Sequence, residues 1–144
     1  MKKIKIYTDG GMFKTNPGPG GWAAVIILES GAYHVMSGAS EEPVTTNNIM
    51  ELMGPIRALE ALPCACDVTI VSDSQYVVKG ATAWRAGWER KGFVGVKNSE
   101  YWKRLYAACE RHKVSWQWVK GHNGDQFNEM ADKAAGEAAR KKWG

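Results

Sequence analysis

The alternation of hydrophobic and polar residues predicts five strands. Over residues 3–8, lysine and tyrosine alternate with isoleucine and threonine, which is the period of a strand with two unlike faces. Apolar or β-branched runs bounded by turn residues predict the other four strands at 22–28, 32–36, 67–72 and 114–119. Short turns join the first three strands, and this favours an antiparallel meander. One of these turns, Asn16–Gly21, is expected to be rigid because it is rich in proline and glycine.

Helical spacing predicts the intervening elements. Between residues 47 and 62 apolar side chains recur every three or four positions, and Thr45 or Thr46 is a suitable N-cap. Pro55 lies inside this segment, and since proline cannot donate to the carbonyl of Glu51, we expect a kink or a loosened turn there. Further helices are predicted from Ser74-Gln75, over 80–92, from 98–99 to about 112, and over 126–142.

The order of these elements predicts an α/β fold. Three strands, a helix, a strand, further helices, a strand and a final helix are typical of a mixed sheet flanked by helices. The expected sheet has five strands, an antiparallel meander plus parallel strands. At 144 residues the chain is long enough to bury a core, and we expect a single domain over 1–144.

Composition and charge narrow the class of protein. Hydrophobic residues make up 44% and charged residues 24%, which are ordinary values for a globular protein. Three cysteines without a Cys-x-x-Cys pair argue against a disulfide framework and a zinc site, and a reducing cytoplasm fits best. No signal peptide and no long apolar run is evident, so a membrane span is not expected. The net charge of +4 suggests a polyanionic partner.

Four acidic residues stand out from the rest. Asp9 and Asp73 each follow a predicted strand, and if these strands are parallel neighbours, both carboxylates reach one edge of the sheet. Glu51 lies one turn into the first long helix, on one face with two asparagines, and Asp132 lies two turns into the last helix. Each acid has a simpler explanation. Asp9 could open an Asp-Gly turn, and the helical acids could be solvated charges.

Clustered carboxylates repel one another unless a cation neutralises them. Hard oxygen ligands, without cysteine or paired histidines, favour Mg²⁺ or Mn²⁺ over zinc. Two such ions held by shared carboxylates would activate a water and stabilise the leaving oxygen of a phosphodiester. The acids therefore predict a metal-dependent phosphodiesterase.

The basic residues are concentrated in one part of the chain. Residues 79–104 contain seven lysines and arginines against two glutamates, a local charge of +5, which leaves −1 for the rest of the chain. Trp84, Trp88 and Phe93 are interleaved with them. Cations beside aromatic rings suit a nucleic-acid backbone. The alternative is a helix with a solvated basic face and tryptophans in the core.

Six sequence blocks in this order resemble ribonuclease H of the type 1 family over essentially the whole chain. The blocks are Tyr7-Thr8-Asp9-Gly10, Asn16–Gly21, Thr46–Leu52, Ser72–Val77, Trp118–His122 and Asn128–Asp132. The resemblance implies the ribonuclease H-like fold with a basic protrusion at about 80–97. It also implies endonucleolytic cleavage of the RNA strand of RNA/DNA hybrids, with 5′-phosphate and 3′-hydroxyl ends.

The resemblance also implies roles for particular residues. Asp9, Glu51, Asp73 and Asp132 would hold two Mg²⁺ ions, with Mn²⁺ as a possible substitute and Asp9 bridging both ions. His122, on a mobile loop, would assist proton transfer and product release. His34 and His112 match no block and are expected to be structural or exposed.

Substrate contacts carry over in the same way. Asn16, Asn47, Asn48 and Gln75 match positions that contact the minor groove or the ribose hydroxyls, which distinguish RNA from DNA. Thr46 matches a contact to a DNA phosphate. Trp84, Trp88, Arg90 and Lys91 would belong to the protrusion, which grips the DNA strand. The expected partner is an RNA/DNA hybrid, and the protein is expected to act as a monomer in the cytoplasm, with no protein partner indicated.

Three features depart from the family pattern. The loop 93–97 is short and has one lysine where well-known members carry a longer lysine-rich run, which puts hybrid affinity in question. Residues 12–15 differ from the usual link before Asn16, and Gly54-Pro55 interrupts the first long helix. None of these changes an acidic position.

Three other hypotheses compete with a ribonuclease H. The chain could be another metal-dependent nuclease on the same fold, such as a transposase core, a resolvase or an exonuclease. It could be a non-catalytic or differently specific nucleic-acid-binding member of that fold, although such a domain would be expected to lack at least one acid. It could also be a structural domain with surface acids, and metal-dependent heat stabilisation would argue against that hypothesis.

Overall fold

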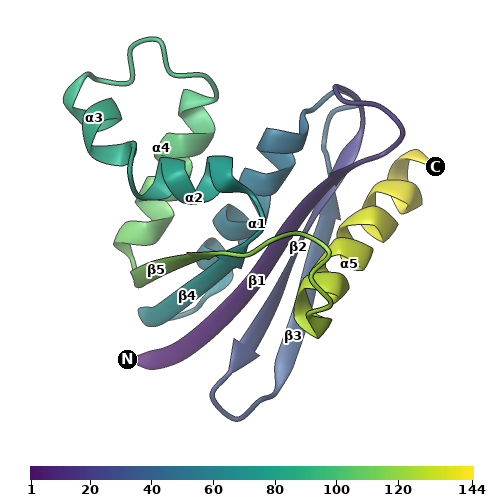
Figure 1. Cartoon of the computed structure of the whole chain (residues 1–144), viewed down its shortest axis with the longest axis horizontal. Coiled ribbons are helices and arrows are strands. Elements are labelled where there is room, and N and C mark those ends of the chain that lie inside the picture. Colours follow the sequence, from purple (N-terminus) through teal and green to yellow (C-terminus); the bar gives the residue numbers. More distant parts are fainter.

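The computed structural model describes residues 1–144 and contains one five-stranded mixed sheet (Figure 1). The strands are β1 (Lys2–Met12), β2 (Gly20–Leu28), β3 (Tyr33–Ala39), β4 (Cys66–Ser72) and β5 (Lys113–Trp118). Their order in the sheet is β3-β2-β1-β4-β5. The first three strands pair antiparallel, whereas β4 runs parallel to both β1 and β5. The predicted meander with added parallel strands is therefore confirmed.

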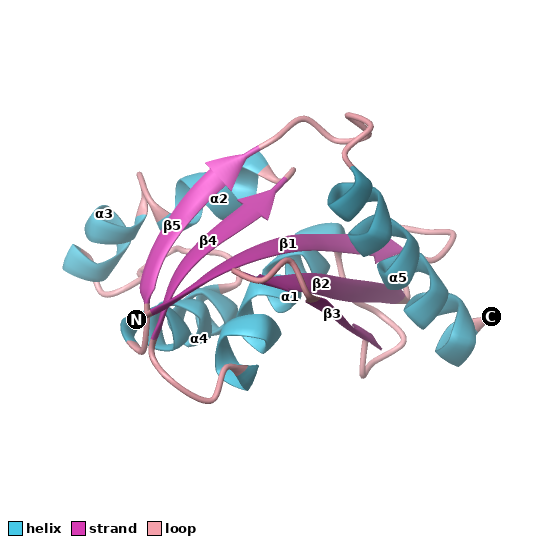
Figure 2. Cartoon of the chain, turned by 90° about the horizontal axis from the view of Figure 1, so that it is seen from below, coloured by secondary structure: helices cyan, strands magenta, loops and turns pink.

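Helices cover both faces of this sheet (Figure 2). They are α1 (Asn47–Ala61), α2 (Gln75–Ala81), α3 (Arg85–Arg90), α4 (Ser99–Glu110) and α5 (Gln126–Trp143). The alternation within β1 matches these layers. Ile4 and Ile6 pack into the main core with α1 and α4, and Tyr7 packs on the opposite face against Ala131 of α5. No helix has the length and apolar character needed to cross a bilayer.

Several predicted boundaries were wrong by a few residues. The strand predicted to begin at Trp22 begins at Gly20, because Gly20 and Gly21 pair with the end of β1 and extend the ladder. The strand predicted at 32–36 continues to Ala39, still paired with β2. The single helix predicted over 80–92 is divided between the end of α2 and α3, and the Thr82 hydroxyl donates to the carbonyl of Val78 where α2 ends.

The helix α1 runs without interruption through Gly54 and Pro55. Gly54 has a packing role, since a Cβ at this position would lie 3.0 Å from the carbonyl oxygen of Ala23 on β2. At the start of α1, the Thr46 hydroxyl accepts from the amide of Ile49 at 3.2 Å, as expected for an N-cap.

Two side chains that come just before β5, those of Arg111 and His112, hydrogen-bond to carbonyl groups at the C-terminal end of α1. His112 accepts from the amide of Cys66 through Nδ1 at 3.1 Å, and its Nε2 lies 3.0 Å from the carbonyl oxygen of Leu59. Since an amide can only donate, this pattern requires the imidazole tautomer with its proton on Nε2. Arg111 donates to the carbonyl of Leu62 at 3.1 Å. His112 therefore joins α1, β4 and β5, whereas His34 is exposed on β3.

Replacing His112 with alanine should lower the free energy of unfolding by about 1–3 kcal/mol, because a partly buried amide and a helix carbonyl lose their partner. Urea denaturation would measure the change. His34→Ala is the matched control and should change stability by less than about 0.5 kcal/mol. Equal effects of the two substitutions would contradict the role of His112 as a link between these elements.

Candidate active site

Three carboxylates meet where β1 and β4 separate. Thr8 is paired with Ser72 at the end of the parallel ladder, so Asp9 and Asp73 come next to each other just beyond it, Asp9 still within β1 and Asp73 directly after β4. One ligand oxygen from each of Asp9, Glu51 and Asp73 lies within 4.8 Å of the others. The expectation that parallel neighbours would bring Asp9 and Asp73 together is met by this geometry.

Gly10 brings Glu51 into this cluster. A Cβ at Gly10 would lie 2.4 Å from the backbone nitrogen of Glu51, so only glycine lets the backbone of α1 cross β1 at this point. The amide of Gly10 donates to Oε1 of Glu51 at 2.5 Å and also to Oδ1 of Asp9 at 3.0 Å. One backbone N–H therefore orients two acids from different elements.

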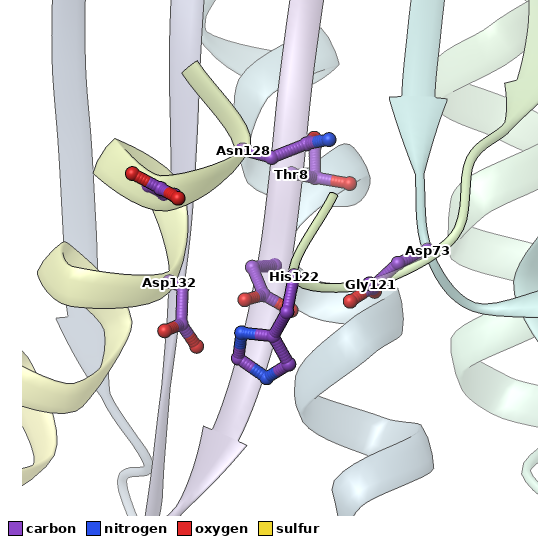
Figure 3. Close-up of a pocket in the computed structure, with 8 residues that line it drawn as sticks. Thr8, Asp73, Gly121, His122, Asn128 and Asp132 are labelled. Carbon is purple, nitrogen blue, oxygen red and sulfur yellow. The ribbon is translucent and has the colours of Figure 1, made fainter. Parts of the chain in front are cut away.

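Asp132 faces the same site from the opposite layer. It comes from α5 and, with His122, lines a cavity of about 20 Å³ beside Asp9 and Asp73 (Figure 3). Asp132 is outside the compact group of three acids. A cavity of this volume holds about one water-sized species. No hydrophobic residue lines it; the lining residues are Thr8, Asp9, Asp73, Gly121, His122, Asn128, Glu129 and Asp132.

Burial and mutual repulsion destabilise the charged forms of these acids. Burial, followed by the charge of Asp73, raises the pKa of Asp9 from 3.8 to about 7. Burial also raises the pKa of Glu51 well above its usual value of 4.5, with further contributions from Asp9 and Asp73. A bound cation would remove this penalty.

The chemistry of the donors fits a hard divalent cation. Carboxylate oxygens are the ligands that Mg²⁺ and Mn²⁺ prefer, and no cysteine lies among the residues of the site. Oδ1 of Asp73 is buried and has no hydrogen-bond partner, so its lone pairs are free. The three-acid cluster is thus chemically suited to metal binding.

His122 lies on the loop between β5 and α5 and has a left-handed backbone, with φ of 53°. The loop is tied to α5 by Asn123, whose side-chain oxygen accepts from the amide of Asp125 at 2.9 Å and from Nδ2 of Asn128 at 3.1 Å. Asp125 in turn caps α5. The imidazole consequently reaches the cavity from a loop rather than from a regular element.

The predicted substrate residues lie on segments that surround the acids. The amide of Asn47 donates to the side-chain oxygen of Asn16 at 3.2 Å, so the loop after β1 contacts the start of α1. Thr46 and Asn48 flank Asn47 in the chain, and Gln75 opens α2 two residues after Asp73. These residues, the polar border, therefore lie on or beside the elements that carry Glu51 and Asp73.

The predicted protrusion consists of α3 and the loop that follows, which extend away from the sheet (Figure 1). Its two tryptophans differ. Trp88 packs against the core residue Trp102 with ring centroids 5.1 Å apart, whereas Trp84 remains 38% exposed. Arg90 and Lys91 are exposed and form no ion pair. Trp84 is therefore the better placed of the two tryptophans to contact a substrate.

Ion pairs occupy part of the basic stretch. Arg85 pairs with Glu89 at 3.1 Å and also with Glu110, and Arg104 pairs with Glu60 at 2.7 Å. Each of these arginines is neutralised by a glutamate of the same chain. Fewer basic side chains are therefore available to bind a polyanion than the local charge of +5 suggests.

Four residues of the cavity were not assigned a role from the sequence, namely Thr8, Gly121, Asn128 and Glu129. Asn128 and Glu129 precede Asp132 by four and three positions, a spacing that places them on the same helical face. That spacing could have identified them. Thr8 gives no such signal, since in the sequence it is an ordinary strand residue next to Asp9.

Comparison with known proteins identifies relatives along nearly the whole chain. Residues 1–140 match the family model for RNase H. A ribonuclease H from Shewanella amazonensis is 48% identical, and the match covers 99% of this chain and 92% of that protein. A ribonuclease HI from Caulobacter vibrioides is 49% identical, with 96% and 94% covered.

Solved structures agree with these matches. LC9-RNase H1 superposes with a TM-score of 0.86 at 29% identity, covering 98% of this chain and 74% of that one. LC11-RNase H1, determined in complex with an RNA/DNA hybrid, gives a TM-score of 0.70 at 26% identity, with 98% and 99% covered.

Proposed function

The chain belongs to the ribonuclease H family, and from this premise we propose that it hydrolyses the RNA strand of RNA/DNA hybrids by a two-metal-ion mechanism. The reaction is endonucleolytic and leaves 5′-phosphate and 3′-hydroxyl ends. The observation that carries the proposal is the cluster of Asp9, Glu51 and Asp73 oxygens, which lie within 4.8 Å of one another beside a cavity that has no hydrophobic lining and is bordered by Asp9 and Asp73. A hybrid bound to the related LC11-RNase H1 supports the substrate class.

Each acid has a distinct place in the proposed mechanism. Asp9, Glu51, Asp73 and Asp132 would hold two Mg²⁺ ions, with Mn²⁺ as a substitute. Such ions would supply the activation of a water and the stabilisation of the leaving oxygen of the phosphodiester. Gly10 aligns Asp9 and Glu51 through its single amide. His122 exchanges a proton with the reacting groups from its loop and assists product release.

The residues of the polar border and of the protrusion select the substrate. Asn16, Asn47, Asn48 and Gln75 contact the minor groove and the ribose hydroxyls. Thr46 contacts a DNA phosphate, although its hydroxyl already accepts from the amide of Ile49 and so has its proton left to donate. Trp84, Trp88, Arg90 and Lys91 form the side of the protrusion that meets the DNA strand, with Trp88 acting mainly by supporting Trp84.

We also propose that residues 1–144 form one catalytic domain that acts as a monomer in the cytoplasm. The three cysteines are free thiols, which is consistent with a reducing compartment. Size-exclusion chromatography with light scattering should give a mass near the 15.9 kDa of the chain.

Cleavage of four labelled substrates tests the function directly. An RNA/DNA hybrid, an RNA duplex, a DNA duplex and single-stranded RNA would each be incubated with Mg²⁺ and with chelator. We expect chelator-sensitive cutting confined to the RNA strand of the hybrid. Binding without cutting would favour the non-catalytic alternative, and cutting of the DNA duplex would favour another nuclease on this fold.

The two tryptophans of the protrusion should respond differently to substitution. Trp84→Ala should weaken hybrid binding by about fivefold or more, because an exposed stacking surface is lost, with little change in melting temperature. Trp88→Ala should lower the melting temperature by several degrees, because it leaves a cavity beside Trp102. Fluorescence anisotropy and thermal denaturation would separate the two effects. A loss of stability in Trp84→Ala equal to that in Trp88→Ala would contradict this division.

A further inference from the structure

The carboxylate of Asp73 is oriented without hydrogen bonds from the backbone. Oδ1 is buried without a partner, and no backbone amide donates to Oδ2; the one donor offered to this carboxylate is the neighbouring Glu51 carboxyl when it is protonated. Asp9 and Glu51 differ, since each accepts from the amide of Gly10. Carboxylates that ligate metals are usually held by a hydrogen bond to a neighbouring group. Something other than a backbone amide must therefore fix the direction of the Asp73 side chain.

The end of β5 fixes the backbone of Asp73. The indole Nε1 of Trp118 donates to the carbonyl oxygen of Asp73 at 3.1 Å. Next in the chain, the amide of Val119 donates to the carbonyl of Ser72 at 3.0 Å. The parallel pairing of β4 and β5 is thus extended by one backbone bond and one side-chain bond, and both hold the turn that presents the carboxylate.

Gly121 limits the position of the Asp73 side chain. A Cβ at this position would lie 3.0 Å from Oδ2 of Asp73 and 3.8 Å from its Cγ. The backbone of the loop therefore lies against the carboxylate, next to His122, as Figure 3 shows. The φ of Gly121 is not in the left-handed region, so the close approach, rather than backbone conformation, is what requires glycine here.

We propose that Trp118–Gly121, the Asp73 frame, is a positioning device for the metal ligand Asp73. The frame orients the carboxylate by one bond to its backbone carbonyl and by contact with a residue that lacks a Cβ. Because no backbone amide donates to either carboxylate oxygen, their lone pairs stay available for a cation once Glu51 is deprotonated. The same segment leads directly into His122, so it also sets the distance between the loop and the acids. This inference rests on the proposed function.

Mg²⁺ titration by calorimetry, without substrate, tests the frame. Trp118→Phe keeps an aromatic ring and removes the N–H. It should raise the Kd for Mg²⁺ by about fivefold to tenfold, the effect of one lost hydrogen bond, and lower kcat with little change in the KM for the hybrid. Gly121→Ala should also raise the Kd for Mg²⁺, because the added methyl displaces the carboxylate. Melting temperatures and circular dichroism would establish that both variants are folded.

Trp143→Phe is the matched control. It removes the same kind of bond, from indole Nε1 to the carbonyl of Ser40 at 3.2 Å, between the end of α5 and the loop after β3. It should leave the Kd for Mg²⁺ and kcat unchanged. Suppose that the unaltered protein cleaves the hybrid and that both Trp118→Phe and Gly121→Ala bind Mg²⁺ with the same Kd as the unaltered protein. The inference about the frame is then wrong, and the proposed function stands. If the unaltered protein neither binds Mg²⁺ nor cleaves the hybrid, both are overturned.

Discussion

Replacing Asp9 with asparagine is expected to reduce cleavage of an RNA/DNA hybrid by about a thousandfold or more, while the metal-free protein becomes more stable. Asp9 is the acid nearest the centre of the site, since it borders Glu51, Asp73 and Asp132. If Asp9 is the metal ligand that we propose, its loss removes several kcal/mol of transition-state stabilisation, which corresponds to that factor. Hybrid binding should remain largely intact, because the protrusion and the polar border are unaltered.

The gain in stability follows from the cost of burying the charged form of Asp9. Burial and the charge of Asp73 raise its pKa from 3.8 to about 7, and asparagine has no charge to bury. At pH 8 in chelator, the variant should be more stable by up to about 4 kcal/mol, measured by urea denaturation. Its shape is close to that of aspartate, so the amide of Gly10 still finds an acceptor.

Asp67→Asn is the matched control for this experiment. Asp67 lies in β4 on the same face of the sheet but away from the acid cluster, and its substitution should alter stability by less than about 0.5 kcal/mol. Cleavage retained by Asp9→Asn would refute the proposed metal site. Loss of cleavage together with loss of stability would instead mean that Asp9 has a structural role.

The stability of the metal-free protein is expected to fall as the pH rises from about 4 to about 8. The folded-state pKa values of Asp9 and Glu51 lie above their ordinary values of 3.8 and 4.5, so in this range the folded protein binds more protons than the unfolded chain. Stability then decreases with pH, by up to about 4 kcal/mol from Asp9 alone, and levels off above its folded pKa of about 7. Urea titrations in chelator at several pH values would measure this slope.

Saturating Mg²⁺ should remove that slope above about pH 5, because the Mg²⁺-bound folded state and the unfolded chain then both carry deprotonated carboxylates. The same titrations with Mg²⁺ would show a nearly constant stability between about pH 5 and pH 8, where it falls in chelator. The variant carrying both Asp9→Asn and Glu51→Gln should have a nearly flat profile under both conditions. A metal-free protein that gains stability between pH 5 and pH 8 would contradict the burial of these acids.

The sequence was sufficient for the topology and for three of the acids. Alternating residues in β1 and a β-branched run in β4 predicted two strands, and Asp9 and Asp73 would meet if those strands were parallel neighbours, as the ladder between Thr8 and Ser72 shows. The first strand was expected to end at Asp9, but β1 continues to Met12 because it stays paired with β2. The helical period of α1 placed Glu51 on its first turns. Such features can be read locally, because strand and helix periods and their caps depend on residues a few positions apart.

Contacts between residues distant in sequence could not be anticipated. Nothing in the local pattern shows that Gly10 receives the backbone of α1, that His112 links Cys66 to Leu59, or that Trp88 packs on Trp102 while Trp84 stays exposed. These pairings arise when helices and strands pack.

The sequence by itself determined the five strands, the long helices and which acids they carry, because side-chain period and turn chemistry are local. Only the tertiary structure decided how the carboxylate side chains are oriented. The amide of Gly10 serves Asp9 and Glu51 together, and Asp73 takes its direction from Trp118 and Gly121 of a different strand and loop. The physical reason is that a carboxylate is oriented by the donors and the atoms packed around it, and here those come from segments brought together only by folding.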